Sequence, residues 1–215
     1  MADEWTRSRY ADTISYNGVG GGGEMDWLIE DISTILKSWG HGGGTVGALI
    51  VISDCEPAIL AVRNAVMRYH GGIVIPEAPA KGEKAENGLI EEAGKTIREY
   101  FCTFLSQIER GVDDVVPLDS DIIRWIVRWV ATCYSRYKMG ADGRTSYERR
   151  RGRSCKSIVV PVGETVHYKQ LGDGGDRENK AESEWSKGVW LGPAERNTET
   201  LIGTSKGVVR AHTVE

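Results

Sequence analysis

The spacing of apolar residues along the chain predicts four amphipathic helices. These segments are residues 24–40, 57–72, about 87–110 and 121–137. In each of them apolar side chains recur at intervals near 3.6 residues, which is typical of a helix with one buried face. Terminal signals support the first two, because the first segment ends at Gly40 and the second begins with Pro57, a residue that suits a first helical turn.

Short apolar runs between and after these helices predict strands. Residues 45–53, TVGALIVIS, form a continuous apolar run that suits a buried sheet position. Two shorter runs, residues 13–19 and 72–78, have strand composition as well. Because strands alternate with helices up to about residue 137, the pattern predicts an α/β core. Five strand-like runs between residues 157 and 214 then predict a small all-β module.

Composition limits the class of protein. With 215 residues and 40% hydrophobic side chains, the chain can bury one core with a small appended module. No apolar stretch approaches the length of a bilayer span, and the polar N-terminus resembles neither a signal peptide nor a transit peptide. We therefore expect an intracellular protein without a membrane partner. The four cysteines form no CxxC pair and the four histidines no HxxxH pair, so a structural zinc site is not predicted.

Charge is distributed unevenly along the chain. The formal net charge is −4, yet residues 121–157 hold ten basic and three acidic residues, which makes +7 there and −11 elsewhere. Such a cluster is typical of a phosphate-binding surface, and it is equally compatible with a solvated basic loop. The candidate nucleic-acid-binding residues in this segment are Arg144, Arg149, Arg150, Arg151 and Arg153.

Two carboxylates are the strongest candidates for chemistry. Asp54 follows the apolar run at residues 45–53, and Glu91 lies near the start of the longest helix. A hard divalent cation needs oxygen ligands from separate rigid elements, which a strand end and a helix start can supply. Lys95 and Arg98 follow Glu91 at helical spacing and could meet phosphates. In the simpler alternative, Asp54 caps the helix that begins at Pro57 and Glu91 pairs with Lys95 on the surface.

Five motifs in order resemble the integrase catalytic core of retroviruses and long-terminal-repeat retrotransposons, most closely the copia-like branch. They are SDCEPAI, ENGLIEEAGKTIR, TSYERRRGR, GVWLG and LIGTSKGVVRAHTV. The 36 residues between Asp54 and Glu91 are close to the family's spacing. The resemblance covers the chain from about residue 11 to its end.

This resemblance implies a ribonuclease H-like mixed sheet flanked by helices, followed by the small β module. Asp54 and Glu91 would hold Mg²⁺ or Mn²⁺, and Lys95 and Arg98 would contact DNA phosphates. The implied partners are the element's own DNA ends and target DNA, with a homo-oligomer as a further expectation, in the nucleus or a cytoplasmic particle. The implied division is an integrase core at residues 11–140, a basic connector at 141–157 and the β module at 158–215.

One departure from the family changes the activity that we expect of this chain. The family's first catalytic aspartate lies on the opening strand of a three-stranded meander, whereas only residues 13–19 predict a strand before the first helix here. Asp12 is the best substitute, and it requires a shortened meander. We therefore expect an integrase-core fragment of a retrotransposon polyprotein that is inactive as an isolated chain. The alternatives are a non-enzymatic module that binds nucleic acid or protein, and a metal-dependent nuclease.

Overall fold

The computed structural model describes residues 1–14, 25–42, 47–78, 84–156, 160–161, 163–169, 185–194 and 199–215, except for the side chains of 84–87 and 112. The chain forms two compact units. The first unit contains Met1–Phe101 and Asp121–Cys155, and the second contains Cys102–Ser120 and Lys156–Glu215. The expected division at residues 140 and 157 stays a prediction. No helix in the described part is long and apolar enough to cross a bilayer.

A β-α-β arrangement forms one part of the first unit. Strands β1 (Leu49–Ile52) and β2 (Val74–Glu77) pair in parallel, with Ile50 opposite Ile75, and helix α2 (Pro57–His70) connects them. The helix begins at a proline in its first turn and ends at Gly71, whose φ of 74° lies in the left-handed region that favours glycine. The helix predicted at 57–72 is confirmed, and strands lie inside the runs at 45–53 and 72–78, of which residues 45 and 46 fall outside the described part. The buried position expected for the first strand is wrong, because Ile50 and Ile52 are 53% and 45% exposed.

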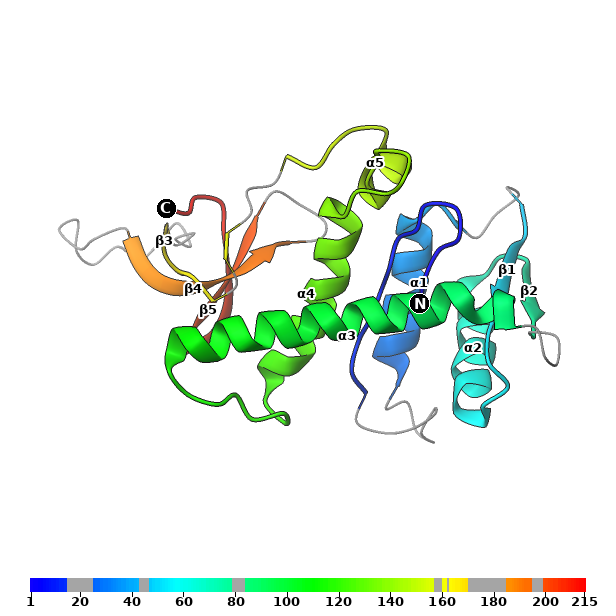
Figure 1. The fold of residues 1–215 in the computed structure, drawn as a ribbon, viewed down its shortest axis with the longest axis horizontal. Helices are drawn as coiled ribbons and strands as arrows, with labels where there is room; N and C mark the ends of the chain where they lie inside the picture. Colours follow the sequence, from blue (N-terminus) through cyan, green and yellow to red (C-terminus); the bar gives the residue numbers. More distant parts are fainter. Residues whose placement is uncertain are drawn as a thin grey trace, which may run out of the picture. The chain divides into compact units, whose positions relative to one another are not determined.

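Helix α1 (Asp26–Ser38) packs against α2 (Figure 1). Their apolar faces form a small core, in which Leu36 and Trp39 of the α1 end meet Ala65 and Val66 of α2. Burial of such a face supplies most of the stability of a short helix. The helix predicted at residues 24–40 is confirmed, with its ends within two residues of the predicted ones.

Helices α3 (Lys84–Val112), α4 (Asp121–Tyr137) and α5 (Ser146–Arg151) follow. The structure begins α3 three residues earlier than the sequence pattern indicated and ends it two residues later. Helix α4 buries Ile126 and Val130 completely, in agreement with the buried face that its periodicity predicts. Helix α5 lies in the basic connector, where one of our two interpretations was a solvated loop. Thr145 caps α5 and Glu148 closes a reciprocal capping box.

The second unit contains an antiparallel sheet of strand order β3-β4-β5-β6, drawn from yellow to red in Figure 1. Its strands are Thr165–Lys169, Trp185–Pro193, Thr200–Thr204 and Gly207–Ala211. Side chains on one face are buried, among them Tyr168, Trp190 and Ile202. Because this unit also includes residues 102–120, an independent module at residues 158–215 stays a prediction.

The structure establishes a chain with both helices and sheets, which agrees with the α/β prediction at the level of class. The finer prediction of a ribonuclease H-like mixed sheet is not settled by the two parallel strands. The strand expected at residues 13–19 falls almost wholly outside the described residues, and residues 13 and 14 are not part of a strand.

Candidate functional site

Asp54 lies two residues beyond the end of β1, with its side chain exposed. Its Oδ1 accepts a hydrogen bond from the backbone N–H of Cys55 at 2.7 Å. The N-cap residue of α2 is Glu56, and no side chain caps that helix. The alternative in which Asp54 is a helix cap is therefore wrong, and its carboxylate lies at a strand end where a cation could reach it.

Glu91 is exposed in the second turn of α3. Lys95 and Arg98 are exposed as well and lie on the same side of the helix, because they follow Glu91 at i+4 and i+7. The ion pair that the structure gives Lys95 is with Glu99, at 4.0 Å between Nζ and Oε1. The surface position of Glu91 agrees with the simpler alternative, whereas the pair with Lys95 that it included is not among the described contacts. Three side chains suited to a cation and phosphates share one helix face.

In the described part of the chain, no three acidic, histidine or cysteine side chains come together in a way that could hold a metal ion. Asp54 and Glu91 are oxygen donors of the type that Mg²⁺ prefers, so their chemistry fits the cation. Two carboxylates alone form a weaker site than three. Their role as metal ligands stays a prediction.

Asp12 sits in a partly buried ion cluster, which we call the Asp12 cluster. Its members are Tyr10, Asp12, Asp31, Arg124 and Arg128. The side chain of Asp12 is only 2% exposed, and its carboxylate receives two hydrogen bonds from Arg124, at 2.9 and 3.2 Å. Arg128 Nη1 lies 3.7 Å from the same carboxylate and Nη2 binds Asp31. Two guanidinium groups therefore occupy the surroundings that a metal ion would need.

The pKa shifts in the Asp12 cluster agree with these ion pairs and hydrogen bonds. The hydrogen bond with Asp12 raises the pKa of Arg124 above its usual value. Burial raises the pKa of Tyr10 well above its usual value, and the hydrogen bond from its hydroxyl to Asp31, 2.8 Å long, raises it further. The phenol thus stays protonated and donates. Asp12 therefore holds the N-terminal segment to α4, and its use as a substitute for the first catalytic aspartate stays a prediction.

The five arginines of the basic segment lie in different surroundings. Arg144, Arg151 and Arg153 are exposed. Arg149 donates from Nε and Nη2 to Asp142, at 3.1 and 2.5 Å, and from Nη1 to the carbonyl oxygen of Thr6 at 3.2 Å. This pair lowers the pKa of Asp142 to about 2 and raises that of Arg149.

Arg150 is the most enclosed of the five. Burial lowers the pKa of its guanidinium, and its Nε has no hydrogen-bond partner within the described residues. Its guanidinium lies 6.0 Å from the centre of the Tyr147 ring. Three of the five candidate nucleic-acid-binding arginines are thus exposed. The other two, Arg149 and Arg150, make contacts within the first unit. Binding by any of the five stays a prediction.

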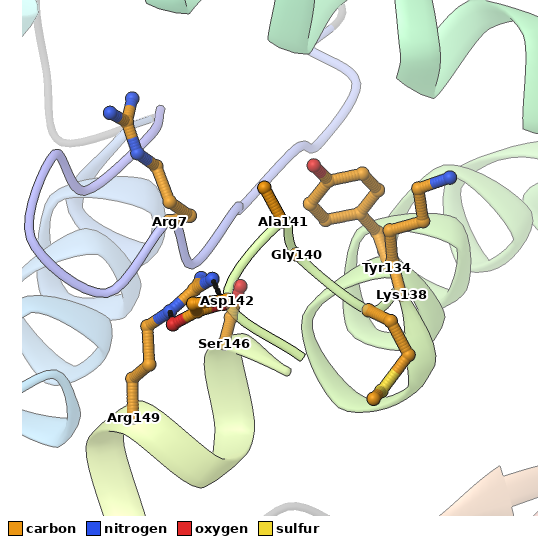
Figure 2. A pocket seen from close by; sticks show the side chains of 9 residues that line it. Arg7, Tyr134, Lys138, Gly140, Ala141, Asp142, Ser146 and Arg149 are labelled. Carbon is orange, nitrogen blue, oxygen red and sulfur yellow. Dashed lines mark hydrogen bonds and ion pairs between the residues drawn. The ribbon is translucent and has the colours of Figure 1, made fainter. Parts of the chain in front are cut away.

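A pocket of about 300 Å³ opens beside Arg149 (Figure 2). It is lined by Arg7, Tyr134, Lys138, Met139, Gly140, Ala141, Asp142, Ser146 and Arg149. Sequence reasoning missed this pocket, because its walls come from the N-terminal turn, the end of α4, the 139–142 turn and α5. No local pattern links segments that are more than a hundred residues apart.

No protein-family model matches the chain, and no curated protein matches its sequence. The chain aligns with a chain of the cryoEM structure of simian T-cell lymphotropic virus intasome in complex with PP2A regulatory subunit B56 gamma, with TM-score 0.40 and 11% identity, over 88% of this chain and 63% of that one. It aligns with the catalytic core domain of BIV integrase with TM-score 0.35 and 14% identity, over 57% of this chain and 70% of that one.

Both neighbours are retroviral integrase structures. At these TM-scores neither carries an argument about a site or a function. The copia-like branch remains a prediction from the motifs.

Proposed function

We propose that this chain is an integrase-core fragment of a retrotransposon polyprotein that binds nucleic acid and does not catalyse DNA strand transfer by itself. One observation supports the claim that the chain does not catalyse strand transfer by itself. Asp12, the best internal candidate for a third metal ligand, is buried and paired with Arg124 and Arg128. Asp54 and Glu91 remain as the two candidate metal ligands of the proposal.

Mg²⁺ or Mn²⁺ bound there would polarise a phosphodiester and lower the pKa of a bound water. Asp54 and Glu91 would each contribute carboxylate oxygens to hold the ion. Lys95 and Arg98, exposed on the face of Glu91, would contact the DNA backbone beside it. With only these two carboxylates as ligands, the first cation would be bound weakly, and the described residues hold no further ligand set for a second, so two-metal chemistry would be lost.

Nucleic-acid binding is supported by the exposed cations of the basic segment. Arg144, Arg151 and Arg153 flank or end the capped helix α5, so the protein supports them on an ordered element. Contacts from arginine to phosphate release counterions, and the resulting affinity falls with rising salt. A homo-oligomer, and a place in the nucleus or a cytoplasmic particle, belong to the same proposal.

Strand-transfer assays with Mg²⁺ and with Mn²⁺ test the catalytic half. The full chain is incubated with a labelled duplex that carries candidate element ends and with a target plasmid. We expect no joined product. Robust joining that is abolished in Asp54→Asn would overturn the claim of inactivity, and cutting without joining would favour the nuclease.

Fluorescence anisotropy with a labelled duplex, over a series of salt concentrations and without divalent metal, tests the binding half. The double variant Arg151→Ala/Arg153→Ala should lose affinity and show a shallower salt slope, by about two counterions. The matched control, Lys37→Ala/Arg68→Ala, removes two exposed cations from α1 and α2 and should have little effect. Glu91→Gln should leave metal-free binding unchanged. Binding that is indifferent to salt, or equal loss in the control, would refute this half.

A further inference from the structure

The pocket beside Arg149 is strongly cationic. Arg7, Lys138 and Arg149 line it, against a single acidic residue, Asp142. Asp142 already forms an ion pair with Arg149. No carboxylate within the described residues pairs with Arg7 or Lys138, whose side chains are exposed at opposite sides of the pocket (Figure 2). Two uncompensated positive charges therefore lie at the rim of the pocket, and their flexible side chains point outward in Figure 2.

The side chain of Arg149, at the base of the pocket, is held in place without a ligand. Arg149 is held by Asp142 on one side and by the Thr6 carbonyl on another. A guanidinium has five N–H donors, so these three bonds leave one N–H on each terminal nitrogen. Gly140 permits this arrangement, because a Cβ there would lie 2.1 Å from Arg149 Nη2. Donors that are already oriented cost less entropy when an anion binds.

Arg7, which lines the pocket, has a strained backbone. Its φ is 61°, in the left-handed region that L residues seldom adopt. The turn is held by hydrogen bonds from the Arg7 N–H to the Asp3 carbonyl, 2.9 Å long, and from the Thr6 N–H to the Asp3 carboxylate, 2.6 Å long. Strain that a surrounding network maintains is commonly found at binding sites.

We propose that this pocket binds the phosphate group of a nucleotide or of a nucleic-acid end, with Arg7 and Lys138 as its cations and Arg149 as its oriented donor. A volume of about 300 Å³ is at the small end of ligand pockets, which suits a phosphate with one nucleoside. Tyr134 lines the same pocket, and the guanidinium carbon of Arg9 lies 3.6 Å from the centre of its ring. The inference does not require the Asp54–Glu91 pair, so it can stand or fall apart from the proposed function.

Calorimetric titration of the full chain with AMP, with inorganic phosphate and with adenosine tests the chemistry. AMP and phosphate should bind, and adenosine should not. The double variant Arg7→Gln/Lys138→Gln should weaken AMP binding by about tenfold or more, equivalent to about 1.4 kcal/mol. The control Lys37→Gln/Arg68→Gln makes the same change in net charge on exposed residues outside the pocket and should bind AMP as the parent does.

A second variant separates binding from folding. Arg7→Gly removes the cation and also relieves the left-handed backbone, so the unfolding midpoint should stay the same or rise while AMP binding weakens. Failure of AMP and phosphate to bind, equal binding of adenosine, or equal weakening in the control pair would overturn the proposal. So would AMP binding that is unchanged in both pocket variants.

Oligonucleotides identify the source of the phosphate. Anisotropy compares the same single strand with a 5′-phosphate and with a 5′-hydroxyl. Tighter binding of the phosphorylated strand that is lost in Arg7→Gln/Lys138→Gln supports a nucleic-acid end. AMP binding without any difference between the strands supports a nucleotide. Only the first outcome links the pocket to the proposed function.

Discussion

Removing the charge of Asp12 should destabilise the first unit without any involvement of metal. Asp12→Asn keeps the shape of the side chain and leaves Arg124 and Arg128 facing a neutral amide. Breaking a fully buried ion pair costs about 3–5 kcal/mol. Asp12 is buried, but the side chains of Arg124 and Arg128 are 41% and 32% exposed, so both can recover hydration. Asp31 also remains as a partner of Arg128. We therefore expect a loss of about 2 kcal/mol in the free energy of unfolding.

Denaturant unfolding measures this loss, followed by tryptophan fluorescence and by far-UV circular dichroism. Trp27 reports on the cluster, because the guanidinium of Arg124 lies 3.9 Å from its ring. Two probes are needed because the two units need not unfold together. The control Glu30→Gln removes one exposed carboxylate from α1 and should change stability by less than about 0.5 kcal/mol.

The same titration with Mg²⁺ separates the two possible roles of Asp12. An ion-pair role gives the same loss with and without the metal. A metal-ligand role gives a parent protein that Mg²⁺ stabilises and a variant that it does not. A change below about 0.5 kcal/mol, or a loss confined to the Mg²⁺ series, would refute our interpretation of the cluster.

Three further predictions concern other parts of the chain. Gly188→Ala should destabilise the sheet of the second unit by about 1–3 kcal/mol in denaturant unfolding, because the added Cβ would lie 2.3 Å from Ile202 Cγ2. Thr145→Ala should cost about 1 kcal/mol in the same measurement, because it removes the cap of α5. Burial raises the pKa of the Cys133 thiol to about 12, so at about pH 8 iodoacetamide should label exposed Cys55 first and Cys133 far more slowly, as seen by mass spectrometry.

Each of these has a matched comparison. Gly203→Ala places its Cβ 3.3 Å from a flexible leucine side chain in the same sheet, so equal costs for Gly188→Ala and Gly203→Ala would contradict the steric argument. Thr145→Ser keeps the capping oxygen, and a loss as large as that of Thr145→Ala would speak against the cap. Labelling of Cys133 as fast as Cys55 in the folded protein would show that its thiol is not buried.

Local features of the sequence were sufficient to predict most helices and several strands. Pro57 and Gly71 mark the ends of α2 through their own backbone preferences, so no distant contact is needed to find them. The capping box of α5 was equally local, since Thr145 and Glu148 have the T-x-x-E spacing, and we overlooked it among the arginines. The strand that pairs with β1 was harder to predict, because pairing depends on segments far away in the chain.

The candidate site was predictable only in part. The sequence placed Asp54 at a strand end and Glu91 on a helix, and the structure agrees with both placements. The sequence alone did not show which arginines would be exposed. Arg149 and Arg151 are two residues apart with the same charge, yet one binds Asp142 and Thr6 and the other is exposed.

The sequence alone determined the alternation of helices and strands and the elements that carry Asp54 and Glu91, because periodicity, proline and glycine act over a few neighbouring residues. Only the tertiary structure decided the role of Asp12 and the existence of the cationic pocket. Asp12 meets Arg124 across 112 positions and Arg149 meets Thr6 across 143. Any aspartate attracts any arginine in the same way, so the choice of partners depends on which segments the packed core brings together.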